Sequence, residues 1–185
     1  AVGCFPPEVQ NAFASSSSFR DISLLLAIPE HQVDLPGGRR PSQNDIWVLA
    51  RTPETLVSIA VEGKVSEPFG PTVREWNPDG SKGRRTRFDF LSLTLGLSNV
   101  PGNIRYQLLH RTASAVLEAQ RFHAKHAVML VHSFSQGDEW FSDFEQFAGL
   151  FGKSVNKGEI QPVGENNGII LHLGWIPGDS RFLKA

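Results

Sequence analysis

The sequence contains only one cysteine, Cys4, among 185 residues. A single thiol excludes an intramolecular disulfide framework and any cysteine-rich zinc centre. Long apolar runs are also missing, since the longest, ISLLLAI at 22–28, is far short of the ~20 residues that a membrane-spanning helix needs. No basic-plus-apolar signal segment is visible either. We therefore expect a cytoplasmic protein that does not enter a membrane.

An excess of charge of either sign is missing as well. The chain has 18 Lys and Arg against 19 Asp and Glu, a formal net charge of -1. Any contact with nucleic acid must therefore rest on local basic clusters, because the field of the whole molecule does not attract a polyanion. The hydrophobic content of 40%, with 13 Phe, is enough for one core, so we predict a single domain over residues 1–185. Since residue 1 is Ala, a truncation before it is allowed for.

Periodicity predicts the elements of this domain. The segment 67–85 is punctuated by Pro and Gly, which favours a loop with one short helix at 74–76 and a flexible tip at 80–83. Pro29 lies within the first strand and confines it to an edge or a bulge. The predicted helices are 6–15, 87–97, 104–126 and 138–152, and the predicted strands are 21–35, 45–51, 55–65, 127–134, 159–163 and 168–176.

A crossover connects two of these strands. The run 127–134 is continuously apolar, as in strands that are buried on both faces of a parallel sheet. The strand 55–65, the helix 104–126 and the strand 127–134 therefore form a parallel β–α–β unit, which should be right-handed. Combined with the hairpins, this predicts an α/β fold with a mixed central sheet flanked by helices.

The hairpin of 45–51 and 55–65 places charged residues at one end of this sheet. If Arg51 pairs with Leu56, Asp45 lies opposite Glu62. Glu62 and Lys64 then point to the same face, because side chains alternate along a strand. Two carboxylates roughly 5 Å apart repel each other and need compensation. A divalent cation is the simplest candidate.

Asp45 followed by Glu62-Gly63-Lys64 on the next strand resembles the active-site motif of the PD-(D/E)XK nuclease superfamily. The runs LPGGRRPSQND (35–45), SIAVEGKVSEPFGP (58–71) and IRYQLLHRTASAV (104–116) resemble an uncharacterised bacterial domain family that is assigned to that superfamily. The resemblance extends from about Leu24 to Phe182. It implies a restriction-endonuclease-like fold, but it says less about activity because the family is one of unknown function.

The motif suggests a nuclease that depends on Mg²⁺ or Mn²⁺ and hydrolyses phosphodiester bonds, with DNA as the expected substrate. Asp45 and Glu62 are the expected metal ligands, and the resemblance implies the carbonyl of Gly63 as a further ligand. Lys64 would orient or deprotonate the attacking water, or neutralise charge in the transition state. The resemblance also implies that Gln107 lies beside the carboxylates; the alternative is that it belongs to a solvated polar face of its helix. The alternative for Glu-x-Lys is a solvated strand that merely alternates acid and base.

Other polar residues have two interpretations each. Glu8 either completes the acidic set or is an acid that the helix dipole favours. Tyr106 and His110 either adjoin the site or lie on a solvated helix face. His123 and His126 have no Cys or third ligand nearby, so we do not predict a zinc site. The residues that could contact phosphates, or could equally be solvated, are Arg39, Arg40, Lys82, Arg84, Arg85, Arg87 and Arg111.

Two functions of different classes follow. The first is the metal-dependent nuclease centred on Asp45, Glu62, Lys64 and Gln107. The second is a catalytically inactive nucleic-acid- or protein-binding module that retains the fold. The sequence leaves the oligomeric state open and is compatible with a homodimer.

Overall fold

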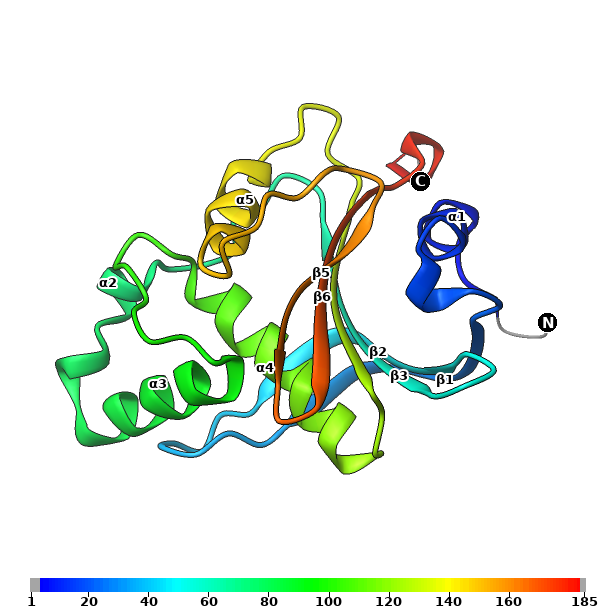
Figure 1. Ribbon diagram of the computed structural model, residues 1–185. Helices are drawn as coiled ribbons and strands as arrows, with labels where there is room; N and C mark the ends of the chain where they lie inside the picture. Colours follow the sequence, from blue (N-terminus) through cyan, green and yellow to red (C-terminus); the bar gives the residue numbers. More distant parts are fainter. Residues whose placement is uncertain (1–3, 184–185) are drawn as a thin grey trace.

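The computed structural model describes residues 4–183, so residues 1–3 and 184–185 of the predicted domain lie outside the described part. Its centre is a six-stranded mixed sheet with the order β1-β2-β3-β4-β6-β5 (Figure 1). The strand pairs β3–β4 and β4–β6 are parallel, and the other pairs are antiparallel. The strands are β1 (Ser23–Val33), β2 (Ser42–Arg51), β3 (Leu56–Lys64), β4 (His126–Ser133), β5 (Ile160–Asn166) and β6 (Ile169–Pro177).

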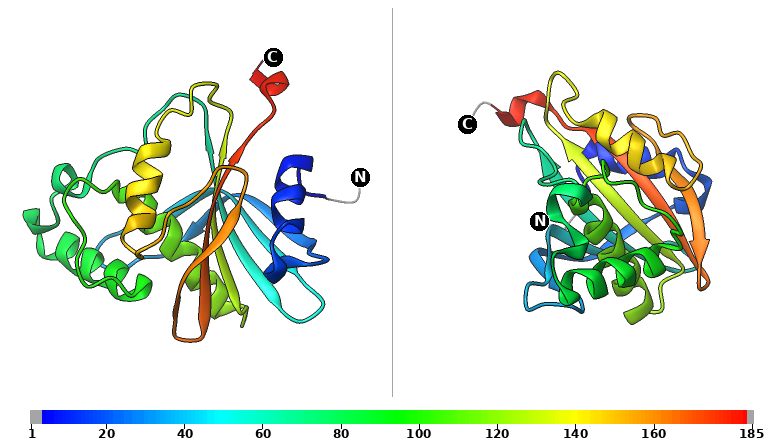
Figure 2. Two further views of the ribbon diagram at one scale, coloured as in Figure 1. Left: turned by 45° about the horizontal axis from the view of Figure 1, so that its top comes forward. Right: turned by 90° about the vertical axis from the view of Figure 1, so that its left-hand side faces the viewer.

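Helices cover both faces of the sheet, as the sequence predicted. Helix α1 lies against one face, and α3, α4 and α5 lie on the other (Figures 1 and 2). Each face has its own core of buried apolar side chains. The helices are α1 (Pro7–Ala14), α2 (Val73–Trp76), α3 (Lys82–Leu95), α4 (Tyr106–Arg121) and α5 (Phe141–Gly149), with short 3₁₀ turns at Ser17–Phe19, Pro78–Gly80 and Ser180–Leu183.

The predicted hairpin register is confirmed. Arg51 pairs with Leu56, and the pairing continues in step to Ile46 opposite Val61. Asp45 and Glu62 are therefore the next residues beyond the last pair of β2 and β3, at the point where the two strands separate. The parallel pairing of β3 with β4 confirms the predicted crossover unit, with α4 as its helix.

The loop predicted over 67–85 is wrong for its last four residues, 82–85. Helix α3 begins at Lys82, five residues earlier than expected, so the basic turn expected in a flexible tip belongs to the helix. Ser81 caps this helix, because its side chain accepts a hydrogen bond from the backbone N–H of Arg84. The short sequence around Gly83 gave no periodic signal that could outweigh its turn-forming composition.

The start of α3 is further held by the loop between β1 and β2. The backbones of Gly37 and Gly83 approach so closely that a Cβ on either would collide with the other residue. The guanidinium of Arg87 donates hydrogen bonds to the carbonyls of Leu35, Pro36 and Gly38. These contacts join two segments that are about fifty residues apart in the sequence. Arg87, one of the predicted phosphate contacts, is buried here and holds the loop.

Strand β1 forms one edge of the sheet and runs through Pro29, as predicted.

Across residues 4–183 we find no helix with the length and apolar character needed to cross a bilayer.

Candidate functional site

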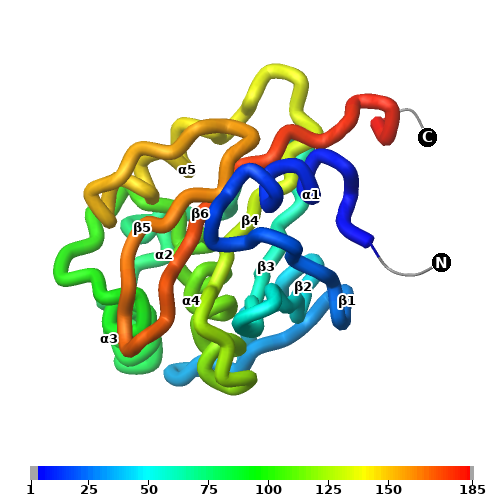
Figure 3. Tube along the Cα trace, turned by 45° about the vertical axis from the view of Figure 1, so that its right-hand side comes forward, coloured from blue at the N-terminus to red at the C-terminus, as the bar shows by residue number. Residues whose placement is uncertain are grey.

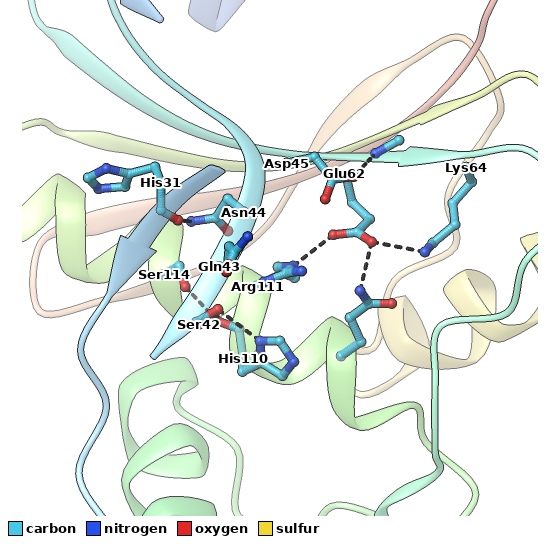
Figure 4. A network of polar contacts seen from close by, with 12 residues as sticks. His31, Ser42, Gln43, Asn44, Asp45, Glu62, Lys64, His110, Arg111 and Ser114 are labelled. Carbon is cyan, nitrogen blue, oxygen red and sulfur yellow. Dashed lines mark hydrogen bonds and ion pairs between the residues drawn. The ribbon is translucent and has the colours of Figure 1, made fainter. Parts of the chain in front are cut away.

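Glu62 lies at the centre of a buried polar cluster near the carboxyl end of β3 (Figure 4). Its side chain is only 3% exposed, yet its carboxylate accepts three hydrogen bonds. Lys64 Nζ lies 2.9 Å and Gln107 Nε2 lies 2.7 Å from Oε1, and Arg111 Nε lies 2.7 Å from Oε2. Hydrogen bonds of this kind from charged donors are stronger than neutral ones. The cluster therefore holds Glu62 in one position.

The regular geometry of strand β3 and of helix α4 brings the side chains of this cluster together. Glu62 and Lys64 are two residues apart on β3, so both side chains point to the α4 face. Gln107 and Arg111 are four residues apart on α4, so both lie on the same side of the helix. The predicted position of Gln107 beside the acids is thus present. Arg111, expected to contact phosphates, instead pairs with Glu62 and is 8% exposed.

Asp45 lies at the gap between β2 and β3. Its Oδ2 accepts a hydrogen bond of 2.8 Å from the backbone N–H of Gly63. Burial raises the pKa of the Asp45 carboxyl above its ordinary value, and the negative charge of Glu62 raises it further. The hydrogen bond from Gly63 and the charges of Arg111 and Lys64 act in the opposite direction. Asp45 thus belongs to the same electrostatic cluster as Glu62, although it does not share a hydrogen bond with it.

The donor chemistry of this cluster fits a hard divalent cation. The carboxylates of Asp45 and Glu62 are oxygen ligands, and Mg²⁺ is commonly held by one or two carboxylates while it keeps several waters. The carbonyl of Gly63 lies on the same edge of β3 as the N–H that contacts Asp45, because both groups of a strand residue point the same way. In residues 4–183, no group of three or more His, Cys, Asp or Glu side chains could hold a metal. The available ligand set is therefore these two acids and a backbone carbonyl.

The cluster opens into different hollows on the two sides of the sheet. On the α4 side, Lys64, Tyr106, Gln107 and Arg111 line a hollow of about 400 Å³. On the α1 side, which is turned forward in Figure 3, Asp45 and Gly63 line a hollow of about 560 Å³. The walls of this second hollow are mainly apolar and aromatic. Asp45 thus borders a hollow that Glu62 and Lys64 do not line, while its carboxylate remains within the electrostatic influence of both.

Glu8 lies in the first turn of α1 and lines the α1-side hollow together with Asp45. Its Oε1 is 2.9 Å from Nε2 of His132 on β4. The first-helix acid is thus in the neighbourhood of Asp45, but its direct partner is a histidine. His132 was not among the predicted site residues, because β4 is apolar along nearly its whole length and gives no polar signal.

His110 links β2 to α4 below the cluster (Figure 4). The hydroxyl of Ser42 is 2.8 Å from its Nδ1. Burial, and then the charges of Arg111 and Arg87, lower the pKa of His110 to about 3. The ring is therefore neutral at physiological pH. Ser42 lies three residues before Asp45, so this contact fixes the start of β2 against the helix that carries Gln107 and Arg111.

A second buried pair lies at the other end of the parallel strands. His126 Nδ1 on β4 is 2.9 Å from His172 Nε2 on β6, and Phe19 packs against both rings. Burial, and to a smaller extent the neighbouring His126, lower the pKa of His172 to about 3. His123, the histidine close to His126 in the sequence, is exposed and is not its partner. The actual partner, His172, is distant in sequence and carried no recognisable motif.

The exposed basic residues remain predicted phosphate contacts. Arg39 and Arg40 are exposed in the loop between β1 and β2, and Arg84 and Arg85 are exposed in the first turns of α3. Arg85 forms ion pairs with Asp79 and Asp89, so part of its charge is already compensated.

Comparisons with known proteins give a family and no function. Nothing among curated proteins or solved structures matches the chain significantly. One family model matches residues 1–180, and its description is "Domain of unknown function (DUF6946)". Because this match covers nearly the whole sequence, the chain belongs to that domain family of unknown function.

Proposed function

We propose that this protein is a Mg²⁺- or Mn²⁺-dependent nuclease with a restriction-endonuclease-like fold that acts on DNA. The observation that carries the proposal is the meeting of Asp45, Glu62 and Lys64 where β2 and β3 separate. The order of α1, three antiparallel strands, α4 and a parallel β4 supports the finer fold assignment. The resemblance of the Asp45 and Glu62-Gly63-Lys64 pattern to PD-(D/E)XK nucleases points in the same direction.

Each side chain of the cluster would have a distinct role. Asp45, Glu62 and the Gly63 carbonyl would hold the divalent cation, which supplies charge neutralisation at the phosphate and an activated water when it is bound. Lys64 is held beside Glu62 at 2.9 Å, where its ammonium group would stabilise negative charge that develops on the phosphate. Gln107 would fix the orientation of the Glu62 carboxylate through its hydrogen bond of 2.7 Å.

One observation favours the second candidate, a binding module that retains the nuclease fold without its activity. The two acids Asp45 and Glu62 are balanced by the two cations Lys64 and Arg111. Arg111 therefore supplies the positive charge that a metal would otherwise provide to Glu62. In an active nuclease, the cation must bind while Arg111 stays close to Glu62 or turns toward the substrate.

The deciding experiment measures metal binding and cleavage in the same samples. Wild-type protein is titrated with Mg²⁺ and Mn²⁺ by calorimetry, and plasmid and oligonucleotide substrates are followed on gels. The nuclease proposal expects both heat and cleavage. Asp45→Asn and Glu62→Gln should abolish both signals, and Lys64→Met should abolish cleavage while metal binding remains.

The matched control is Glu54→Gln, which removes an exposed acid from the other end of the same hairpin. It should leave metal binding and cleavage unchanged. Metal binding without cleavage on any substrate supports the binding module. Absence of metal binding in wild-type protein overturns the metal site itself.

A further inference from the structure

Two basic segments that are far apart in the sequence form one surface in the fold. The loop with Arg39 and Arg40 packs on the start of α3 through the close contact of Gly37 with Gly83. Arg87 reinforces this contact with its three hydrogen bonds to loop carbonyls. The exposed arginines of the loop are therefore held next to the exposed basic turn that begins α3.

Most of the charge on this surface is uncompensated. Within residues 4–183, the side chains of Arg39, Arg40, Lys82 and Arg84 form no ion pair. Arg85 is the exception, since it pairs with Asp79 and Asp89. A chain with a net charge of -1 that gathers four unpaired cations on one surface has a local preference for anions.

An aromatic stack connects this surface to the candidate site. Arg84 donates a hydrogen bond of 2.9 Å to the carbonyl of Trp76, and its guanidinium lies 5.8 Å from the Trp76 ring. Trp76 in turn stacks on Tyr106, with ring centroids 4.0 Å apart and an angle of 10° between the planes. Tyr106 lines the α4-side hollow together with Lys64 and Gln107. The half-buried Trp76 thus lies between the cations of α3 and the cluster, and the buried Tyr106 supports its ring from below.

The α1-side hollow has the opposite character. Its polar lining consists of Glu8, Asp45 and His132, with no Lys or Arg. A phosphate backbone would be repelled there and attracted on the α3 side. An anionic strand should therefore reach the cluster along α3 and Trp76.

We infer that Arg39, Arg40, Lys82 and Arg84 bind the backbone of a single-stranded nucleic acid, which passes over Trp76 to the hollow beside Lys64. A duplex covers the faces of its bases by stacking, so an aromatic side chain among cations can stack only on an unpaired base or end. This assignment rests on the proposed function, because it gives the site its substrate class: single strands or strands with unpaired ends.

The test is a binding measurement without metal. Fluorescence anisotropy in EDTA follows a labelled oligothymidylate of about 20 nucleotides and a duplex of the same length, at several KCl concentrations. Wild-type protein should bind the single strand at least about tenfold more tightly than the duplex. Equal or tighter binding of the duplex overturns the assignment.

Substitutions distinguish contacts with the phosphate backbone of the nucleic acid from stacking of a base on Trp76. The double variant Arg39→Ala/Arg40→Ala and the single variant Arg84→Ala should each weaken binding, and each lost phosphate contact should reduce the salt slope by about 0.7. Trp76→Leu should weaken binding about tenfold while the salt slope stays the same. Circular dichroism confirms that each variant is folded. An unchanged affinity of either arginine variant, or of a folded Trp76→Leu, overturns the corresponding contact and with it the path.

The matched control is Arg51→Ala, which removes the same charge at the opposite end of β2. It should change the affinity by less than about twofold because it lies outside the surface. If this control weakens binding as much as Arg84→Ala, the interaction is non-specific and the inference fails. Because binding is measured without metal, absence of cleavage would remove the proposed nuclease activity alone, and absence of this binding pattern would remove the single-strand surface alone.

Discussion

Polar side chains are buried at both ends of the central parallel strands, but the two ends stabilise them in different ways. At the carboxyl end of β3, the side chain of Glu62 is surrounded by three donors on β3 and α4. At the start of β4, His126 contacts His172, and both rings are packed against the aromatic ring of Phe19. One end is an ionic cluster beside a hollow, and the other is an uncharged pair within the core.

This difference bears on the proposed nuclease site. A histidine whose pKa is lowered to about 3 carries no charge at neutral pH, and it suits an apolar interior. The Glu62 cluster concentrates charges of both signs, and its members line a hollow of about 400 Å³. Buried charges are costly unless they are paired, so such clusters are concentrated at functional sites. Substitutions at the two ends should therefore affect the free energy of unfolding in different ways.

The largest effect is expected for Glu62→Ala. Removing this carboxylate leaves Lys64 and Arg111 close together in a buried site without a counter-charge. The free energy of unfolding should fall by about 3–5 kcal/mol. Urea denaturation at pH 7 measures it, with Glu54→Ala at the exposed turn as the control. A loss below about 1 kcal/mol would contradict the paired state of the cluster.

The next effect is a pH dependence at the histidine end. The pKa of His172 is lowered in the folded state, so folding favours the neutral ring. Its stabilising contribution is complete above the unfolded pKa of about 6.5 and is lost as the pH falls below that value. Between pH 7 and 5, this loss should amount to about 2 kcal/mol.

Urea denaturation at the two pH values tests this dependence. His172→Phe should flatten it by about 2 kcal/mol, whereas the control His123→Gln, at an exposed histidine, should not. An unchanged pH dependence in His172→Phe would show that this pair titrates normally.

A smaller effect is expected for Gln107→Ala. This variant removes one of three donors to Glu62 and leaves both cations in place. We expect a loss of about 1.5 kcal/mol in the free energy of unfolding, the lower end of the range for a hydrogen bond to a charged group, because two donors to Glu62 remain. Gln120→Ala, at an exposed position near the end of the same helix, is the control and should have almost no effect. Equal losses in the two variants would refute the specific role of Gln107.

The smallest effect is expected for Glu8→Gln. The contact of Glu8 with His132 is partly exposed, and even fully charged pairs of this kind contribute only about 0.2–1 kcal/mol. Urea denaturation should therefore detect a loss of less than about 1 kcal/mol. A loss comparable to that of Glu62→Ala would mean that Glu8 belongs to the charged cluster around Asp45.

Local patterns predicted much of the framework around the site. The alternation in 45–51 and 55–65 and the turn at Thr52-Pro53-Glu54 were enough for the register that brings Asp45 and Glu62 to one end. The apolar run after α4 was enough for a parallel strand. The predicted start of α3 was wrong, because a capping serine and a contact with a distant loop outweighed the Gly-rich composition of this segment.

The sequence by itself determined the strands, their alternation and the end of the sheet at which two acids and a lysine meet, because these depend on neighbouring residues and on the fixed geometry of a strand. Only the tertiary structure decided that Arg111 pairs with Glu62, that His126 meets His172, and that Arg39 and Arg84 share one surface. These contacts join residues far apart in the chain. They depend on how α3, α4 and β6 pack against the sheet, which no local pattern encodes.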